Sequence, residues 1–149
     1  MPWLGTVTVV GVVVLAALVV LFFRQHRKDM IAAMLEKRRA TSKLVTRADY
    51  VEGTEEIPVA LALTESTFYY ENPDLEASFD LDRIDEIEYA DSLATGHEIS
   101  DACRVLRLRS HGATFEFLLG KDECAKWMAA LPARSYGNIT APAATPVAV

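Results

Sequence analysis

The feature that most constrains this chain is an uncharged, apolar run at its N-terminus. Residues 1–23 contain no charged side chain, and Trp3–Phe23 is a stretch of 21 residues interrupted only by two Gly and two Thr residues. As a helix rising about 1.5 Å per residue it would span roughly 31 Å, which is the thickness of a bilayer hydrocarbon core. A core helix of a small soluble protein would show a polar face, and this run has none. We therefore predict a transmembrane anchor over residues 1–23.

The residues that flank this run predict its orientation. A cleaved signal peptide would begin with basic residues and end at a small-residue cleavage site, whereas this run has no Lys or Arg before it and ends in two Phe residues. Arg24, Arg27 and Lys28 follow at once. The positive-inside rule then places the N-terminus outside and the rest of a single-pass protein in the cytoplasm, at the plasma (inner) membrane. In that reducing compartment Cys103 and Cys124 are expected to be free thiols.

Residues 24–44 are predicted to form a basic juxtamembrane helix or linker. Counted to residue 47, this segment has eight Lys and Arg against two acids, a net charge of +6, and Met30, Ile31, Met34 and Leu35 would make a narrow apolar stripe on a helix. One interpretation is a solvated linker whose charges only set the topology. The other is a segment on anionic headgroups, where each cation contributes about 1 kcal/mol. The membrane-surface residues in that second interpretation are Arg24, Arg27, Lys28, Lys37, Arg38 and Arg39.

Residues 45–132 show the two-residue alternation that is typical of strands. Apolar residues recur at every second position in several short runs, among them Val59–Leu63, Leu106–Leu108 and Phe115–Leu119. Turn-forming residues separate these runs, which predicts six or seven short antiparallel strands with one face in solvent. Ala48–Glu52 is the weakest of the predicted strands.

The period changes to 3.6 residues near the end of this region. Asp122 and Glu123 would lie in the first turn of a helix, where the helix dipole favours acidic residues. Pro132 ends the pattern. We therefore expect one short amphipathic helix that covers an open end of the sheet. The residues predicted to form its cap on the barrel core are Cys124, Trp127, Met128 and Leu131.

Four runs follow one another in this region and end at Trp127: Leu61–Tyr70, Phe79–Tyr89, Val105–Leu108 and Phe115–Phe117. This succession resembles the pleckstrin-homology (PH) superfamily, and most of all its GRAM-like and bacterial PH-like branch. The resemblance covers about residues 45–132. It implies an α+β protein in which the N-terminal transmembrane helix precedes a small antiparallel PH-like β-barrel, partly open and seven-stranded, capped by a C-terminal α-helix. It also implies a platform for lipids, peptides or proteins.

The charge of this region bears on which of those ligands to expect. Between Ala48 and Pro132 there are 19 Asp and Glu against six Lys and Arg, a net charge of −13, and no Lys or Arg occurs from Ala48 to Asp82. A phosphoinositide pocket needs several converging cations. We therefore expect a cytoplasmic protein-interaction or scaffolding module with a protein partner. The alternative is a membrane-surface lipid sensor in which the basic segment and the barrel loops contact anionic lipid. We also expect that the acidic domain can fold back on the basic segment, which we call the stalk, and mask its positive charge.

Catalytic, metal-binding and nucleic-acid functions have little support in the sequence. The His and Cys residues lack the short spacing of a structural zinc site, and no phosphate-binding loop or nucleophile motif occurs. Arg104, Arg107 and Arg109 are expected to pair with acidic residues across strands rather than with nucleic acid. We expect no enzyme activity, no cofactor and no metal. Residues 133–149 are predicted to be a disordered tail.

Overall fold

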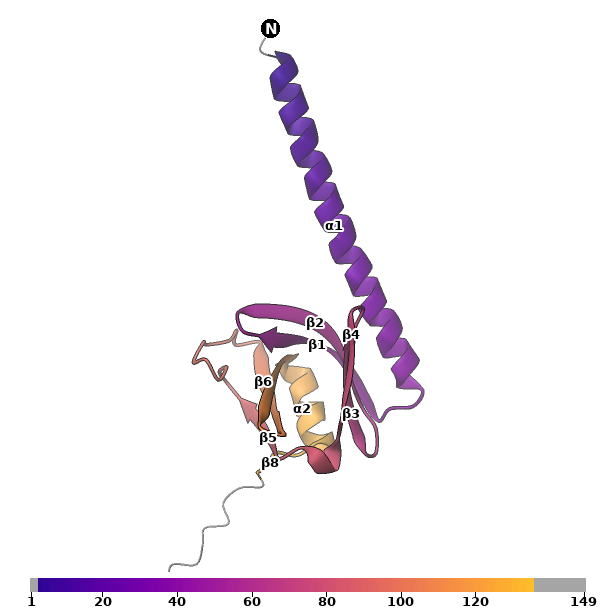
Figure 1. Ribbon diagram of the computed structural model, residues 1–149, viewed down its shortest axis with the longest axis vertical. Coiled ribbons are helices and arrows are strands. Elements are labelled where there is room, and N and C mark those ends of the chain that lie inside the picture. The colour runs from indigo at the N-terminus through magenta and orange to yellow at the C-terminus, as the bar shows by residue number, and fades with distance from the viewer. Residues whose placement is uncertain (1–2, 136–149) are drawn as a thin grey trace, which may run out of the picture.

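A computed structural model describes residues 3–135, with side chains from Val10 onward, so the predicted tail beyond residue 135 lies outside the described residues. The fold is α+β: a long helix, a curled antiparallel sheet of eight strands and a second, short helix (Figure 1). The helices are α1 (Trp3–Arg39) and α2 (Lys121–Ala130), and a 3₁₀ turn, η1 (Leu81–Arg83), follows the fourth strand. The strands are β1 (Leu44–Glu52), β2 (Glu55–Leu63), β3 (Thr67–Asn72), β4 (Leu75–Asp80), β5 (Glu86–Ala90), β6 (Cys103–Ser110), β7 (Ala113–Gly120) and β8 (Arg134–Ser135).

Helix α1 is long and apolar enough over its N-terminal part to be a candidate membrane span. Every described side chain from Val10 to Arg24 is exposed, although most of them are Val, Leu, Ala or Phe. An apolar surface of this extent is typical of contact with lipid or with another protein. The helix then continues without interruption past Arg24 and ends at Arg39, where the Thr41 N–H donates to the Arg38 carbonyl at 3.0 Å. The basic segment is therefore helical.

The sheet has the strand order β4-β3-β2-β1-β7-β6-β5-β8 and curls around α2 as a half-barrel (Figure 1). Two meanders, β1–β4 and β5–β7, are joined by antiparallel pairing of β1 with β7. The structure departs from the sequence prediction at both ends of this region. The strand expected to be weakest is nine residues long and begins at Leu44. Arg134 and Ser135, predicted to be disordered, form β8 against β5 because Arg134 also donates to the carbonyls of Leu81 and Ile84.

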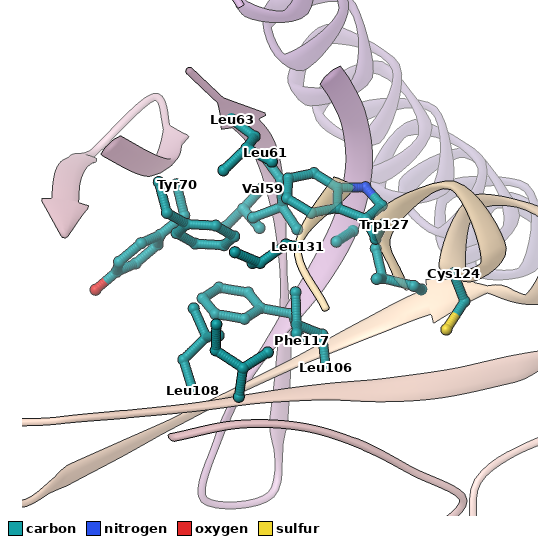
Figure 2. Close-up of a cluster of buried hydrophobic side chains, with 14 of the residues drawn as sticks. Val59, Leu61, Leu63, Tyr70, Leu106, Leu108, Phe117, Cys124, Trp127 and Leu131 are labelled. Carbon is teal, nitrogen blue, oxygen red and sulfur yellow. The ribbon is translucent and has the colours of Figure 1, made fainter. Parts of the chain in front are cut away.

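The hydrophobic core lies between the concave face of the sheet and α2. Trp127 is fully buried among apolar side chains of the sheet (Figure 2). Its ring lies 5.6 Å from that of Phe68. Cys124 and Leu131 are also buried, as predicted. Met128 is an exception, because 49% of its side chain is exposed. A helix turns about 100° per residue, which places Met128 roughly 100° from Trp127 and at the edge of the apolar face. Met128 is therefore no part of the core.

Candidate functional site

The convex face of the sheet, opposite α2, is covered at its two ends by different parts of the chain. Helix α1 contacts β1, β2 and β3 at one end, in a region that we call the junction. The loop of residues 91–102, between β5 and β6, covers β6 and β7 at the other end. Between this loop and the β1–β2 hairpin lies a space that we call the cleft.

The junction is an apolar contact between α1 and β2. Ile31, in the predicted apolar stripe, is 1% exposed, and the other three stripe residues are half-buried. Ala60 and Ala62 alternate along β2 with the core residues, so they face outward. Each is only 2% exposed, because α1 lies over this strand. Their small side chains let the helix approach the sheet closely. The stripe therefore packs on the domain, which neither sequence interpretation of the basic segment anticipates.

A charged cluster of Arg38, Glu71 and Glu76, which we call the clamp, lies at the end of the junction nearest the C-terminus of α1. The Arg38 guanidinium donates to both carboxylate oxygens of Glu71, at 3.2 and 3.0 Å, and to Glu76 at 2.6 Å. The same group lies 4.2 Å from the centre of the Tyr69 ring. Glu71 is 5% exposed, and a carboxylate buried to this extent requires a partner of this kind. Arg38, which the sequence predicts to lie on lipid headgroups, has its guanidinium paired within the protein in this structure.

The other predicted membrane-surface residues lie outside this clamp. Arg39 pairs with Glu36 on the exposed side of α1, at 3.2 Å. Four further cations are exposed and have no ion pair within residues 10–135: Arg24, Arg27, Lys28 and Lys37. The acidic domain therefore engages one of the six predicted surface cations and leaves most of the stalk charge uncovered.

The loop of residues 91–102 is held to the sheet by a buried carboxylate. Glu116 is 8% exposed and accepts from the Ala94 N–H and from Arg107 Nε, both at 2.8 Å. Arg107 also donates to the Ser92 carbonyl at 3.1 Å and to Glu88 at 2.6 Å. These bonds satisfy the buried acid and fix the first half of the loop. The second half, which includes His97 and Glu98, forms one wall of the cleft.

The cleft has a volume of about 490 Å³. The wall opposite the loop of residues 91–102 is the tight β1–β2 hairpin. Gly53 in this hairpin adopts a φ of 63°, which residues with a side chain rarely adopt. Apolar side chains from both walls and from the sheet line it: Val51, Leu93, Ile99 and Leu118. Its charged lining residues are all acidic: Asp49, Glu56 and Glu98. The cleft therefore combines apolar surface with negative charge.

The carboxylates of the cleft differ from those of the neighbouring strands in having no partner. Asp49, Glu56 and Glu98 make no ion pair or hydrogen bond with any other side chain in the described part of the chain. On β5 and β7, and at Asp91 directly after β5, the opposite holds, and the predicted pairing of the three arginines with acidic neighbours is confirmed. The pairs are Arg104 with Asp91, Arg107 with Glu88 and Glu116, and Arg109 with Glu86.

The two thiols lie in different environments, and both are free, as predicted. Cys103 is half-buried and lines the cleft. Cys124 lies on the buried face of α2, and this burial raises the pKa of its thiol. The neighbouring Tyr89 hydroxyl donates to the Leu131 carbonyl at 2.7 Å, and burial raises its pKa strongly as well. Cys103 is therefore the thiol that a reagent in solution would reach first.

Comparison with known proteins assigns no family to this fold. No protein-family model, curated protein or solved structure matches the chain. Among residues 3–135, no group of three or more His, Cys, Asp or Glu side chains is placed to hold a metal ion. The geometry of the junction and the cleft therefore carries the functional proposal.

Proposed function

We propose that this protein is a single-pass membrane protein whose acidic, PH-like sheet domain is a cytoplasmic protein-interaction or scaffolding module. The observation that carries the proposal is the continuity of α1, which runs unbroken from the apolar segment into the face packed on β2. The turn between β3 and β4 shares a small cavity with Arg27, four residues beyond Phe23. Four residues of helix rise about 6 Å. The domain would thus be displayed directly beneath the bilayer.

The charge of the domain favours a protein over a lipid as its ligand. Anionic headgroups repel a domain with a net charge of −13 at this short range. The cleft offers apolar surface bordered by carboxylates, and none of its described lining residues is a Lys or Arg that would bind a phosphate. The curled sheet and its capping helix also agree with the PH-like resemblance, which implies a platform for ligands.

One observation supports the alternative, a sensor of the membrane surface. Arg24, Arg27, Lys28 and Lys37 are exposed on the stalk and unpaired among the described residues, so each is available to anionic lipid. This contact would involve the stalk rather than the domain. Replacing all four by Gln should therefore weaken binding to anionic vesicles and leave partner binding by the domain unchanged.

Topology and partner capture together test the proposal. In intact cells, a membrane-impermeant thiol reagent should leave Cys103 unmodified, and it should modify Cys103 in inside-out vesicles. Photo-crosslinkers placed at exposed positions of the sheet domain in the full-length protein should capture the same protein from native membranes in repeated experiments. Modification of Cys103 from outside the cell would contradict the cytoplasmic placement. Capture of lipid alone at every position would favour the sensor.

A further inference from the structure

We infer that the cleft binds the basic cytoplasmic juxtamembrane segment of another membrane protein. The inference rests on the proposed function, because it requires the domain to be cytoplasmic and membrane-anchored. It goes further in assigning the docking surface and the chemistry of the partner. Three features of the cleft support it: its lining, its unpaired charge and its position relative to α1.

The lining of the cleft matches the two parts of a Lys or Arg side chain. Val51 and Leu118 present apolar surface from the sheet, while Glu56 and Glu98 stand on opposite walls. Lys and Arg bury an aliphatic stem against apolar surface and keep the charged group beside polar or acidic atoms. A volume of about 490 Å³ lies within the range of sites that hold a ligand or several side chains. The cleft therefore fits a cationic segment with an occasional apolar residue.

The unpaired carboxylates specify the sign of the partner's charge. Elsewhere on the convex face the buried acids, Glu71 and Glu116, are satisfied by arginines of the same chain. In the cleft, Glu56 on the hairpin wall, Glu98 on the loop wall and Asp49 on β1 have no cation partner among the described residues. A cationic ligand would be attracted by this negative charge, whereas an anionic ligand would be repelled by it.

The position of the cleft supplies the source of that cation. In Figure 1, β1 and β2 lie, with the turn between β3 and β4, on the side of the domain that faces the N-terminal half of α1, which carries the apolar segment. The hairpin that joins them forms one wall of the cleft. The cytoplasmic ends of transmembrane segments carry an excess of Lys and Arg close to the bilayer. A juxtamembrane segment of a neighbouring protein would thus present the complementary charge at this level, while anionic headgroups would present the wrong one.

The native thiol of Cys103 allows occupancy of the cleft to be measured. The full-length protein is placed in nanodiscs of uncharged phosphatidylcholine, and alkylation of Cys103 is followed with and without a short synthetic peptide rich in Lys and Arg that contains two Leu residues. The matched control is the same peptide with Glu at every Lys and Arg position. We expect the basic peptide to slow alkylation of Cys103 by about tenfold or more at saturation and the acidic peptide to have no effect. Protection of Cys124 throughout shows that the domain stays folded.

Variants test whether the cleft is the site of this effect. The double substitution Glu56→Lys/Glu98→Lys should weaken binding of the basic peptide about tenfold or more, and Val51→Ser should weaken it severalfold through the apolar contact. Asp82→Lys, which reverses an exposed acid on η1 away from the cleft, should leave the affinity within about twofold. Added salt should weaken binding to the native protein.

Several results would overturn the inference. Equal protection of Cys103 by both peptides, or an affinity unchanged by Glu56→Lys/Glu98→Lys, would show that the cleft does not select cations. Protection by phosphatidylserine nanodiscs without peptide would assign the cleft to lipid, and protection that grows with protein concentration alone would assign it to a second copy. If photo-crosslinks still captured a partner elsewhere on the domain, only the assignment of the cleft would fail. Modification of Cys103 from outside the cell would remove the proposed function as well.

Discussion

The junction and the cleft lie at two ends of the same sheet face. Apolar surface and charge are covered at the junction and left open at the cleft. At the junction, Ile31 is buried against β2, and Glu71 is neutralised by Arg38. At the cleft, Val51 and Leu118 line an open space, and Glu98 has no partner among the described residues. The acidic composition of the domain thus has two meanings: some carboxylates hold the structure together, and others are left available for binding. Net charge alone does not distinguish them.

Ile31→Ala should have the largest effect on this comparison. Because Ile31 is 1% exposed, its truncation should lower the free energy of unfolding of the full-length protein in detergent by about 2–4 kcal/mol. Denaturant unfolding followed by tryptophan fluorescence would measure it. Met128→Ala is the matched control, because its side chain is 49% exposed and its loss should change stability by less than about 0.5 kcal/mol. Equal effects of the two substitutions would show that α1 is not packed on the sheet.

Arg38→Ala tests the charged part of the junction. The substitution leaves Glu71 buried without its partner, which should destabilise the domain by about 2 kcal/mol, a value reduced from that of fully buried pairs because Arg38 is 17% exposed. Arg39→Ala removes an exposed pair with Glu36 and should cost about 0.5 kcal/mol or less. A double-mutant cycle of Arg38 with Glu71 measures the coupling. A coupling near zero would contradict the clamp.

Glu116→Ala should loosen the loop that forms one wall of the cleft. Its carboxylate holds the Ala94 N–H and Arg107, so its loss should destabilise the domain by about 1–2 kcal/mol. Hydrogen exchange at the Ala94 amide and alkylation of Cys103 should both become faster. Glu88→Ala removes the more exposed partner of the same arginine and should leave the loop in place. Unchanged exchange at Ala94 in the Glu116 variant would show that other contacts hold the loop.

The sequence predicts best the elements whose pattern of apolar residues lies within one continuous segment of the chain. The uncharged run predicts the exposed apolar part of α1, and the alternation predicts the strands. The 3.6-residue period predicts the burial of Cys124, Trp127 and Leu131 on and just after α2. The sequence of β2 also carries a signal for the junction. Ile57–Leu63 has no polar residue, and a strand that is apolar on both faces is covered on both faces.

The junction clamp and the cleft were not predictable from local pattern, because each joins distant segments. Arg38 and Glu71 are 33 residues apart, and nothing near Arg38 in the sequence distinguishes it from Arg39. The cleft forms only when the β1–β2 hairpin and the loop of residues 91–102 meet over β7. The pairing register of the strands and the path of the loop of residues 91–102 decide which carboxylates lie beside a cation. Neither can be read from the amino-acid composition.

Charge reversal at the cleft should have the smallest effect on stability, and this result would sharpen the comparison most. Glu98 is exposed and unpaired among the described residues, so Glu98→Lys should change the free energy of unfolding by no more than about 0.5 kcal/mol. The change is small in either direction, because Glu98 makes no ion pair among the described residues that the substitution would break. Glu71→Lys, the same reversal at the junction, should prevent stable folding because it places a cation against Arg38. Denaturant midpoints of the two variants compare the sites directly. A large loss of stability in Glu98→Lys would mean that the cleft carboxylates are structural, like those of the junction.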